Sequence, residues 1–156
     1  MRTLLPLFAA FAIVLPVQAD EQQVTLEKLP TAVKAAFVKH FPDAKFKKAS
    51  SEKEDGKLVY EVAFTNMDAN FEATFDAKGT LLEVEKEIAA KDLPKAVIDG
   101  LAVKYAKSTV HKVVEISKDG GKPSGYEVIV ETPDKEKIEV KLDRAGRITG
   151  EEKHAK

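Results

Sequence analysis

The chain has no cysteine and no tryptophan among its 156 residues, and aromatic residues make up only 7%. The missing cysteine excludes disulfide frameworks, thiolate metal sites and cysteine nucleophiles. An excess of one charge is also missing, because 25 basic and 26 acidic residues leave a formal net charge of −1. That balance argues against a nucleic-acid-binding protein, which needs a basic face to neutralise phosphates. At 44%, hydrophobic residues are too many for a disordered chain, so we expect a small folded protein.

Only the N-terminus carries a long hydrophobic run. Arg2 precedes an apolar stretch over residues 4–15, and Val17-Gln18-Ala19 forms a small-residue cleavage site. This pattern indicates a secretory signal peptide over residues 1–19, and the run is too short to span a bilayer, which takes about 20 residues. The alternatives are an N-terminal anchor or a buried helix. Cleavage would leave no stable membrane anchor and a periplasmic or secreted protein.

The remaining sequence contains two similar segments, one after the other. Leu29-Pro30-Thr31-Ala32-Val33 recurs as Leu93-Pro94-Lys95-Ala96-Val97, and Tyr60-Glu61-Val62 recurs as Tyr126-Glu127-Val128. Similarity at a fixed offset is typical of an internal duplication. The sequence therefore predicts a lead-in (20–27), a first repeat (28–88), a second repeat (91–150) and a charged, frayed tail (151–156).

Each predicted repeat opens with a helix. Leu29, Val33, Phe37 and Phe41 recur every four residues and so form one apolar stripe, as do Leu93, Val97, Leu101 and Tyr105 in the second repeat. Gly100 lies inside the second helix and is expected to cost it about 1 kcal/mol relative to alanine.

Strands follow each helix. Tyr60, Val62 and Phe64 alternate with more polar neighbours, which is typical of an antiparallel strand with one buried face. Asp55-Gly56 indicates a hairpin turn. The sequences Asp76-Ala77-Lys78-Gly79 and Asp143-Arg144-Ala145-Gly146 each predict a turn that ends in a left-handed glycine. The predicted fold is therefore α+β, with one helix and three or four antiparallel strands per repeat. We expect one continuous sheet with both helices packed on one face.

No catalytic, cofactor-binding or metal-binding residue is predicted. His40, His111 and His154 are too scattered to converge on a metal ion. Ser50 and Lys53 have the S-x-x-K spacing of serine acylases, but they lie at the end of a predicted strand and lack the partner motifs of that chemistry. We therefore expect a protein without enzymatic activity.

Several of these short motifs resemble the PepSY-like family, also called β-lactamase-inhibitor-like. The resemblance rests on Leu-Pro-x-Ala-Val opening a helix, Phe41-Pro42-Asp43-Ala44, Asp55-Gly56, Tyr60-Glu61-Val62 and the Asp76-to-Gly79 turn. It covers residues 28–149, although Ala106-Lys107-Ser108 replaces the Pro-Asp-Ala step in the second repeat. The resemblance implies an exported bacterial protein with helices on an antiparallel sheet, whose open face grips a protein, and it implies no catalytic residues.

We predict that the sheet face opposite the helices binds a protein of the cell envelope and inhibits or regulates an envelope enzyme. That face would present Glu61, Glu72, Thr74, Glu83, Glu85, Glu127, Ile129, Glu139 and Lys141. It is acidic in the first repeat and mixed in the second, so it would suit a basic partner. The alternative is a small-ligand or envelope-stress protein with a pocket between helix and sheet. That pocket would be lined by Phe37, Phe41, Phe64, Phe71 and Phe75.

Overall fold

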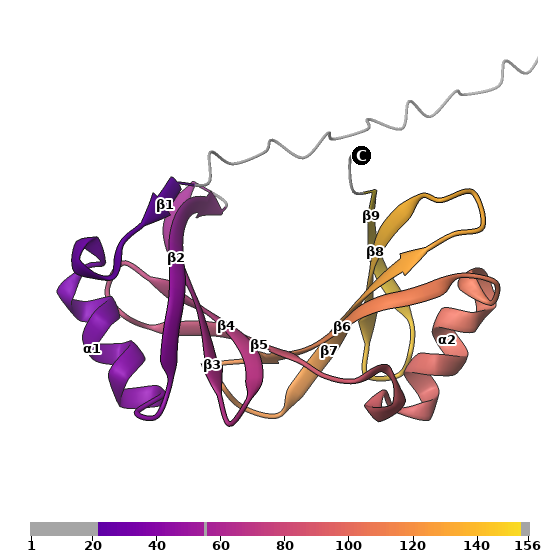
Figure 1. Cartoon of the computed structure of the whole chain (residues 1–156), viewed down its shortest axis with the longest axis horizontal. Coiled ribbons are helices and arrows are strands. Elements are labelled where there is room, and N and C mark those ends of the chain that lie inside the picture. The colour runs from indigo at the N-terminus through magenta and orange to yellow at the C-terminus, as the bar shows by residue number, and fades with distance from the viewer. Residues whose placement is uncertain (1–21, 55, 154–156) are drawn as a thin grey trace, which may run out of the picture.

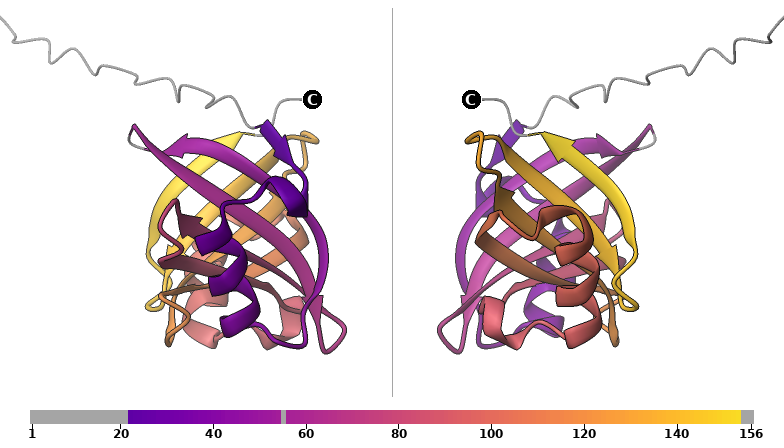
Figure 2. Two further views of the ribbon diagram at one scale, coloured as in Figure 1. Left: turned by 90° about the vertical axis from the view of Figure 1, so that its left-hand side faces the viewer. Right: turned by 90° about the vertical axis from the view of Figure 1, so that its right-hand side faces the viewer.

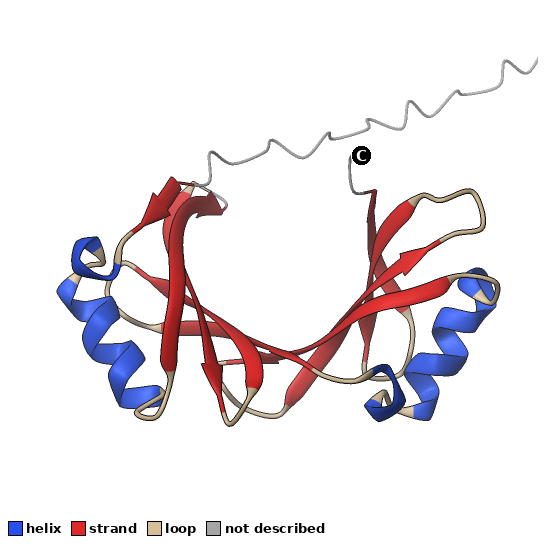
Figure 3. Cartoon of the chain, in the orientation of Figure 1, coloured by secondary structure: helices blue, strands red, loops and turns tan. Residues whose placement is uncertain are grey.

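The computed structural model describes residues 22–54 and 56–153, so the expectations for the signal peptide, Asp55 and His154 lie outside the described residues. These described residues form two α-helices and nine β-strands (Figure 3). The elements are β1 (Gln22–Val24), a 3-10 turn (Leu26–Lys28), α1 (Thr31–His40), β2 (Lys45–Glu54), β3 (Lys57–Asn66), β4 (Ala69–Asp76), β5 (Leu81–Glu87), a second 3-10 turn (Ala90–Asp92), α2 (Lys95–Tyr105), β6 (Thr109–Lys118), β7 (Pro123–Glu131), β8 (Lys137–Asp143) and β9 (Ile148–Lys153).

All nine strands belong to one antiparallel sheet in which their order is the order of the chain. The two halves join where β5 pairs with β6, from Glu83 opposite Lys118 to Glu87 opposite Val114. The fold is therefore α+β, with the continuous sheet that the sequence predicted.

The sheet bends into a trough, and both helices lie on its outer, convex side (Figures 1 and 2). Each helix covers a core of its own. In the first half, α1 packs over a cluster that includes Val62, Phe64 and Phe75, and in the second half α2 packs over Val128, Val130 and Val140. None of the helices formed by residues 22–54 and 56–153 lies on the concave side, between the two arms of the sheet.

The second predicted helix stripe is confirmed, and the first is confirmed except for its last residue. Val33 and Phe37 of α1 are buried, as are Val97, Leu101 and Tyr105 of α2 and the residues Leu29 and Leu93 that precede the two helices. Phe41 lies one residue beyond α1 and is only half-buried, because Pro42 disfavours the helical conformation at the residue before it. Side chains that recur every four residues lie on one side of a helix, so these stripes fix which side of each helix meets the sheet.

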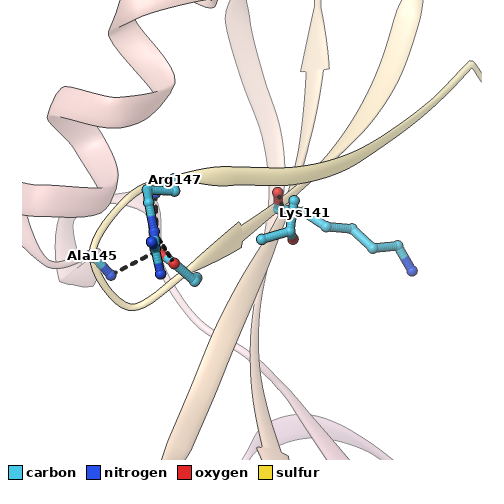
Figure 4. A network of polar contacts seen from close by, with 5 residues as sticks. Lys141, Ala145 and Arg147 are labelled. Carbon is cyan, nitrogen blue, oxygen red and sulfur yellow. Dashed lines mark hydrogen bonds and ion pairs between the residues drawn. The ribbon is translucent and has the colours of Figure 1, made fainter.

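The two predicted glycine turns are also confirmed. Gly79 and Gly146 adopt φ values of 82° and 81° in the β4–β5 and β8–β9 turns. In the second turn, the Asp143 carboxylate accepts hydrogen bonds from the backbone N–H groups of Ala145 and Arg147 (Figure 4). An alanine Cβ at Gly79 would lie 2.5 Å from the carbonyl oxygen of Ala32. The turns therefore sit against the helices, and glycine permits both the backbone conformation and the close approach.

The two sheet edges differ from expectation. The lead-in forms β1, which pairs with Ala49, Ser50 and Ser51 of β2. Residues 151–153 were expected to fray, but they extend β9 along β8. Strand length at an edge depends on the neighbouring strand, which local composition does not reveal.

Candidate functional site

The concave side of the sheet holds a hollow of about 600 Å³. Nine glutamates and two lysines line it, and we call it the acidic hollow. Its residues are Glu52, Glu54, Glu61, Glu72, Thr74, Glu83, Glu85, Lys112, Val114, Glu127, Ile129, Glu139, Lys141 and Glu152. All nine residues that the sequence placed on the open face lie in this hollow.

Strand alternation and register bring these residues together. Glu61 stands opposite Thr74, and Thr74 stands opposite Glu83 on the next strand. Their sequence neighbours Val62, Ala73 and Val84 point to the other face and are buried in the core under α1. Because side chains alternate along a strand, burying the apolar set against the helix forces the acidic set into the hollow.

The half of the hollow built from β2 to β5 is lined by six glutamates and Thr74. Burial, followed by the nearby charges of Glu127, Glu72 and Glu83, raises the pKa of Glu85 from 4.5 to about 7. Burial and the charge of Glu127 also raise the pKa of Glu83, although Lys118 and Lys141 oppose this. These half-buried carboxylates repel one another, and their ionised forms would be stabilised by an added cation.

The other half of the hollow balances part of its charge internally. The Lys141 Nζ atom lies 2.8 Å from Glu127 Oε1 and 3.5 Å from Glu139 Oε1. Burial by itself would lower the pKa of Lys141. The hydrogen bonds and negative charges of Glu127 and Glu139 outweigh burial, so the pKa of Lys141 is raised. Figure 4 shows the Lys141 side chain extending away from Arg147. Ile129 is half-buried rather than exposed, and it lies opposite Lys112 on the neighbouring strand.

Three carboxylates at one end of the hollow come closer together than the sequence suggested. Glu52, Glu54 and Glu61 bring one oxygen each to within 4.8 Å of one another, a spacing that could hold a metal ion. The Ser50 hydroxyl donates a hydrogen bond of 3.3 Å to Glu61 Oε2. Histidine spacing in the sequence could not indicate this group, because its three glutamates come together only across the β2–β3 pair.

Five residues of the hollow were missed on the sequence: Glu52, Glu54, Lys112, Val114 and Glu152. Alternation along β2 and β6 could have assigned the first four to the same face. Glu152 was assigned to a tail, so only the pairing of β9 with β8 could have placed it.

The phenylalanines of the alternative prediction largely fill their own core. The Phe64 ring centroid lies 4.6 Å from that of Phe41 and 5.2 Å from that of Phe37. Phe37, Phe64 and Phe75 are buried. Phe64 and Phe71 also border a hollow of about 380 Å³, so the rings both fill the core and reach a surface depression.

Several solved structures share this fold. A structure from Bacteroides eggerthii, described as "putative periplasmic proteins", is 16% identical, with a TM-score of 0.67 over 80% of this chain and 88% of that one. A DUF2874 family protein from Bacteroides uniformis is 19% identical, with a TM-score of 0.66 over 80% and 88%. A "BLIP-like protein" from Bacteroides fragilis is 23% identical, with a TM-score of 0.62 over 81% and 88%. At these identities the likeness shows the fold alone.

No curated protein matches the chain significantly. No helix within residues 22–54 and 56–153 is both long and apolar enough to cross a membrane. The family described as "Putative beta-lactamase-inhibitor-like, PepSY-like" matches residues 15–82 and again residues 58–149. Together these two matches span most of the sequence, and the chain therefore belongs to the PepSY-like, β-lactamase-inhibitor-like family.

Proposed function

We propose that this protein is an exported, non-enzymatic binding module whose acidic hollow receives a basic region of a protein partner. The observation that carries the proposal is the charge of the hollow, which holds nine glutamates and two lysines on the concave face of the sheet. Charge complementarity steers a partner toward such a face and fixes its orientation.

The shape of the acidic hollow favours a partner with a protruding loop or hairpin. A hollow of about 600 Å³ accepts a loop or hairpin tip. The half-buried Ile129 provides an apolar contact point beside the acidic groups. An apolar side chain of the partner would cover Ile129 while its lysines or arginines meet Glu72, Glu83 and Glu85.

The proposal also includes an internal duplication, export from the cell and a role toward an envelope enzyme. We infer that the segments 28–88 and 91–150 are two copies of one unit, since helix and strands follow in the same order in both halves. We also propose export to the periplasm or beyond, supported by the signal-peptide pattern and by the periplasmic description of a structural neighbour. In that compartment the partner would be an envelope enzyme that the module inhibits or regulates.

The test is capture from envelope extract of the native organism with immobilised protein, followed by elution with salt. The variant Glu61→Gln/Glu72→Gln/Glu83→Gln removes three charges from the acidic hollow. The control variant Asp43→Asn/Asp68→Asn/Asp134→Asn removes three charges from exposed turns elsewhere. Changing Glu61, Glu72 and Glu83 to lysine should weaken binding more than changing them to glutamine.

We expect a captured basic protein to be retained by the control variant and lost from the hollow variant, while both variants keep the wild-type melting temperature to within a few degrees. Equal retention by the two variants would refute a role for the acidic hollow. Loss of activity when a captured enzyme is mixed with the protein would identify inhibition.

A further inference from the structure

The two halves of the protein fill the corner between helix and sheet differently. In the first half, Phe64 on β3 packs between Phe41 and Phe71, with ring centroids 4.6 and 5.4 Å away. Phe71 in turn lies under Lys86, whose Nζ atom is 6.0 Å from the ring centroid. Aromatic rings therefore occupy this corner, and the hollow that Phe64 and Phe71 border measures about 380 Å³.

Strand register identifies the matching positions in the second half. Phe64 pairs with Phe71 and Phe71 with Lys86, just as Val130 pairs with Ile138 and Ile138 with Lys153. Tyr105 ends α2, whereas Phe41 directly follows α1. Two phenylalanine rings of the first half therefore correspond to the smaller Val130 and Ile138.

A hollow of about 750 Å³ lies at this corner of the second half. We call it the Tyr105 hollow, and its lining comprises residues 104–108, Thr132, Pro133, Ile138 and residues 151–153. Its volume is within the range of about 300–1,000 Å³ that is typical of small-molecule sites. It lies on the helix side of the sheet and shares only Glu152 with the acidic hollow.

The base of this hollow is held in place. The Tyr105 hydroxyl donates a hydrogen bond of 2.6 Å to Glu151 Oε1, and Lys104 Nζ lies 2.5 Å from Glu151 Oε2. Tyr105 and Ile138 are each only 8% exposed, so they form a packed apolar base. A preformed site of this kind needs little ordering when a ligand binds.

We propose that the Tyr105 hollow binds a small molecule with an aromatic ring and an anionic head, such as an aromatic carboxylate or sulfonate. The ring would occupy the space that Phe71 fills in the first half. Lys153 pairs with Glu136, with its Nζ atom 3.0 Å from Glu136 Oε1, so its alkyl chain would border the ring. Lys104 already neutralises Glu151. Lys107 and the Ser108 hydroxyl at the end of α2 then offer a cation and a donor for the anionic head.

The probe for this proposal is the aromatic sulfonate 8-anilinonaphthalene-1-sulfonate, titrated into the purified protein by fluorescence. The variant Ile138→Phe restores a ring at the position equivalent to Phe71, and we expect it to weaken probe binding by about tenfold or more. Ile98→Phe is the matched control, because it makes the same change at an exposed position of α2 that does not line the Tyr105 hollow. That control should leave probe affinity unchanged, and bound probe should shift the amide NMR signals of Ser108 and Thr132.

A second probe separates the anionic head from general apolar binding. The neutral dye N-phenyl-1-naphthylamine keeps the aromatic rings but lacks the sulfonate, and it should bind several-fold more weakly. Equal affinity for the two probes would overturn the anionic part of the proposal. The whole site would be overturned by undetectable sulfonate binding or by unchanged binding to Ile138→Phe. Should Ile138→Phe not fold, as judged by circular dichroism, the exposed change Lys107→Glu takes its place. It should weaken sulfonate binding by roughly threefold or more, and unchanged affinity would overturn the assignment.

Discussion

Glu72 on β4 and Glu85 on β5 lie directly opposite each other in the acidic hollow. Like charges at opposed positions of an antiparallel pair are destabilising, and here burial adds to the repulsion. The fold thus keeps an electrostatically unfavourable arrangement on the concave face of the sheet. An arrangement of this kind is typical of a site whose charges are satisfied by something that binds there.

The pKa of Glu85 makes stability depend on pH. Its pKa is 4.5 in the unfolded chain and about 7 in the folded protein, so between these values the folded state binds more protons. The stabilising contribution is fully present below pH 4.5 and is lost as the pH rises through 7. Glu85→Gln should therefore raise the free energy of unfolding at pH 8 by about 1–3 kcal/mol and change little at pH 4.5.

Urea unfolding at several pH values measures this effect. Asp134→Asn, in the exposed β7–β8 turn, is the control and should leave the pH profile as in the wild type. A Glu85→Gln profile that runs parallel to the wild type would contradict the assigned pKa. The same ionisation should make a basic partner bind more tightly at pH 8 than at pH 5.5.

We expect Gly100→Ala to destabilise the protein, although alanine has the higher helix propensity. Propensity alone predicts that Gly100→Ala stabilises α2 by about 1 kcal/mol. A Cβ atom there would collide with the carbonyl oxygen of Gly146 in the β8–β9 turn, so we expect a loss of about 2–4 kcal/mol instead. Thermal unfolding checks this, with Ala102→Gly at an exposed position of α2 as the control for propensity. A Gly100→Ala protein more stable than the wild type would show that the helix and the turn can separate without cost.

Lys141 is expected to stabilise the second half of the acidic hollow. Lys141→Met leaves Glu127 and Glu139 without their nearest cation, and we expect a loss of about 1 kcal/mol at pH 7. The estimate is small because the lysine side chain is 49% exposed. The loss should shrink at pH 4, where glutamates become protonated. Lys122→Met in the exposed β6–β7 turn should change stability by less than about 0.5 kcal/mol, and equal effects of both variants would refute a specific role for Lys141.

Phe64 is expected to be the most sensitive ring of the first core. It is fully buried and contacts Phe37, Phe41 and Phe71. Phe64→Leu should lower the free energy of unfolding by about 1–3 kcal/mol, because the lost ring leaves a cavity among the other three. Phe46→Leu, at a half-buried position, should cost less in the same denaturant titration. A larger loss from Phe46→Leu would place the centre of this core elsewhere.

Local patterns in the sequence were enough to predict much of the fold. The four-residue spacing of Leu29, Val33 and Phe37 determined the buried side of α1, because the helical period places these side chains together. Alternation along β3 and β4 separated Val62 and Ala73 from Glu61 and Glu72 for a similar reason. The glycines at positions 79 and 146 marked turns whose φ values few other residues adopt.

Only the tertiary structure decided how distant strands meet. The sequence contains nothing local that pairs β1 with β2, extends β9 through Lys153 or brings Gly100 against Gly146, because each depends on a partner segment far along the chain. The curvature that gathers the glutamates of both halves into one hollow arises from the packing of the whole sheet. The Tyr105 hollow also arises from tertiary packing, because none of the small side chains that line it indicates a hollow in the sequence. Local sequence therefore determined which face each side chain takes, and long-range packing decided which of those side chains became neighbours.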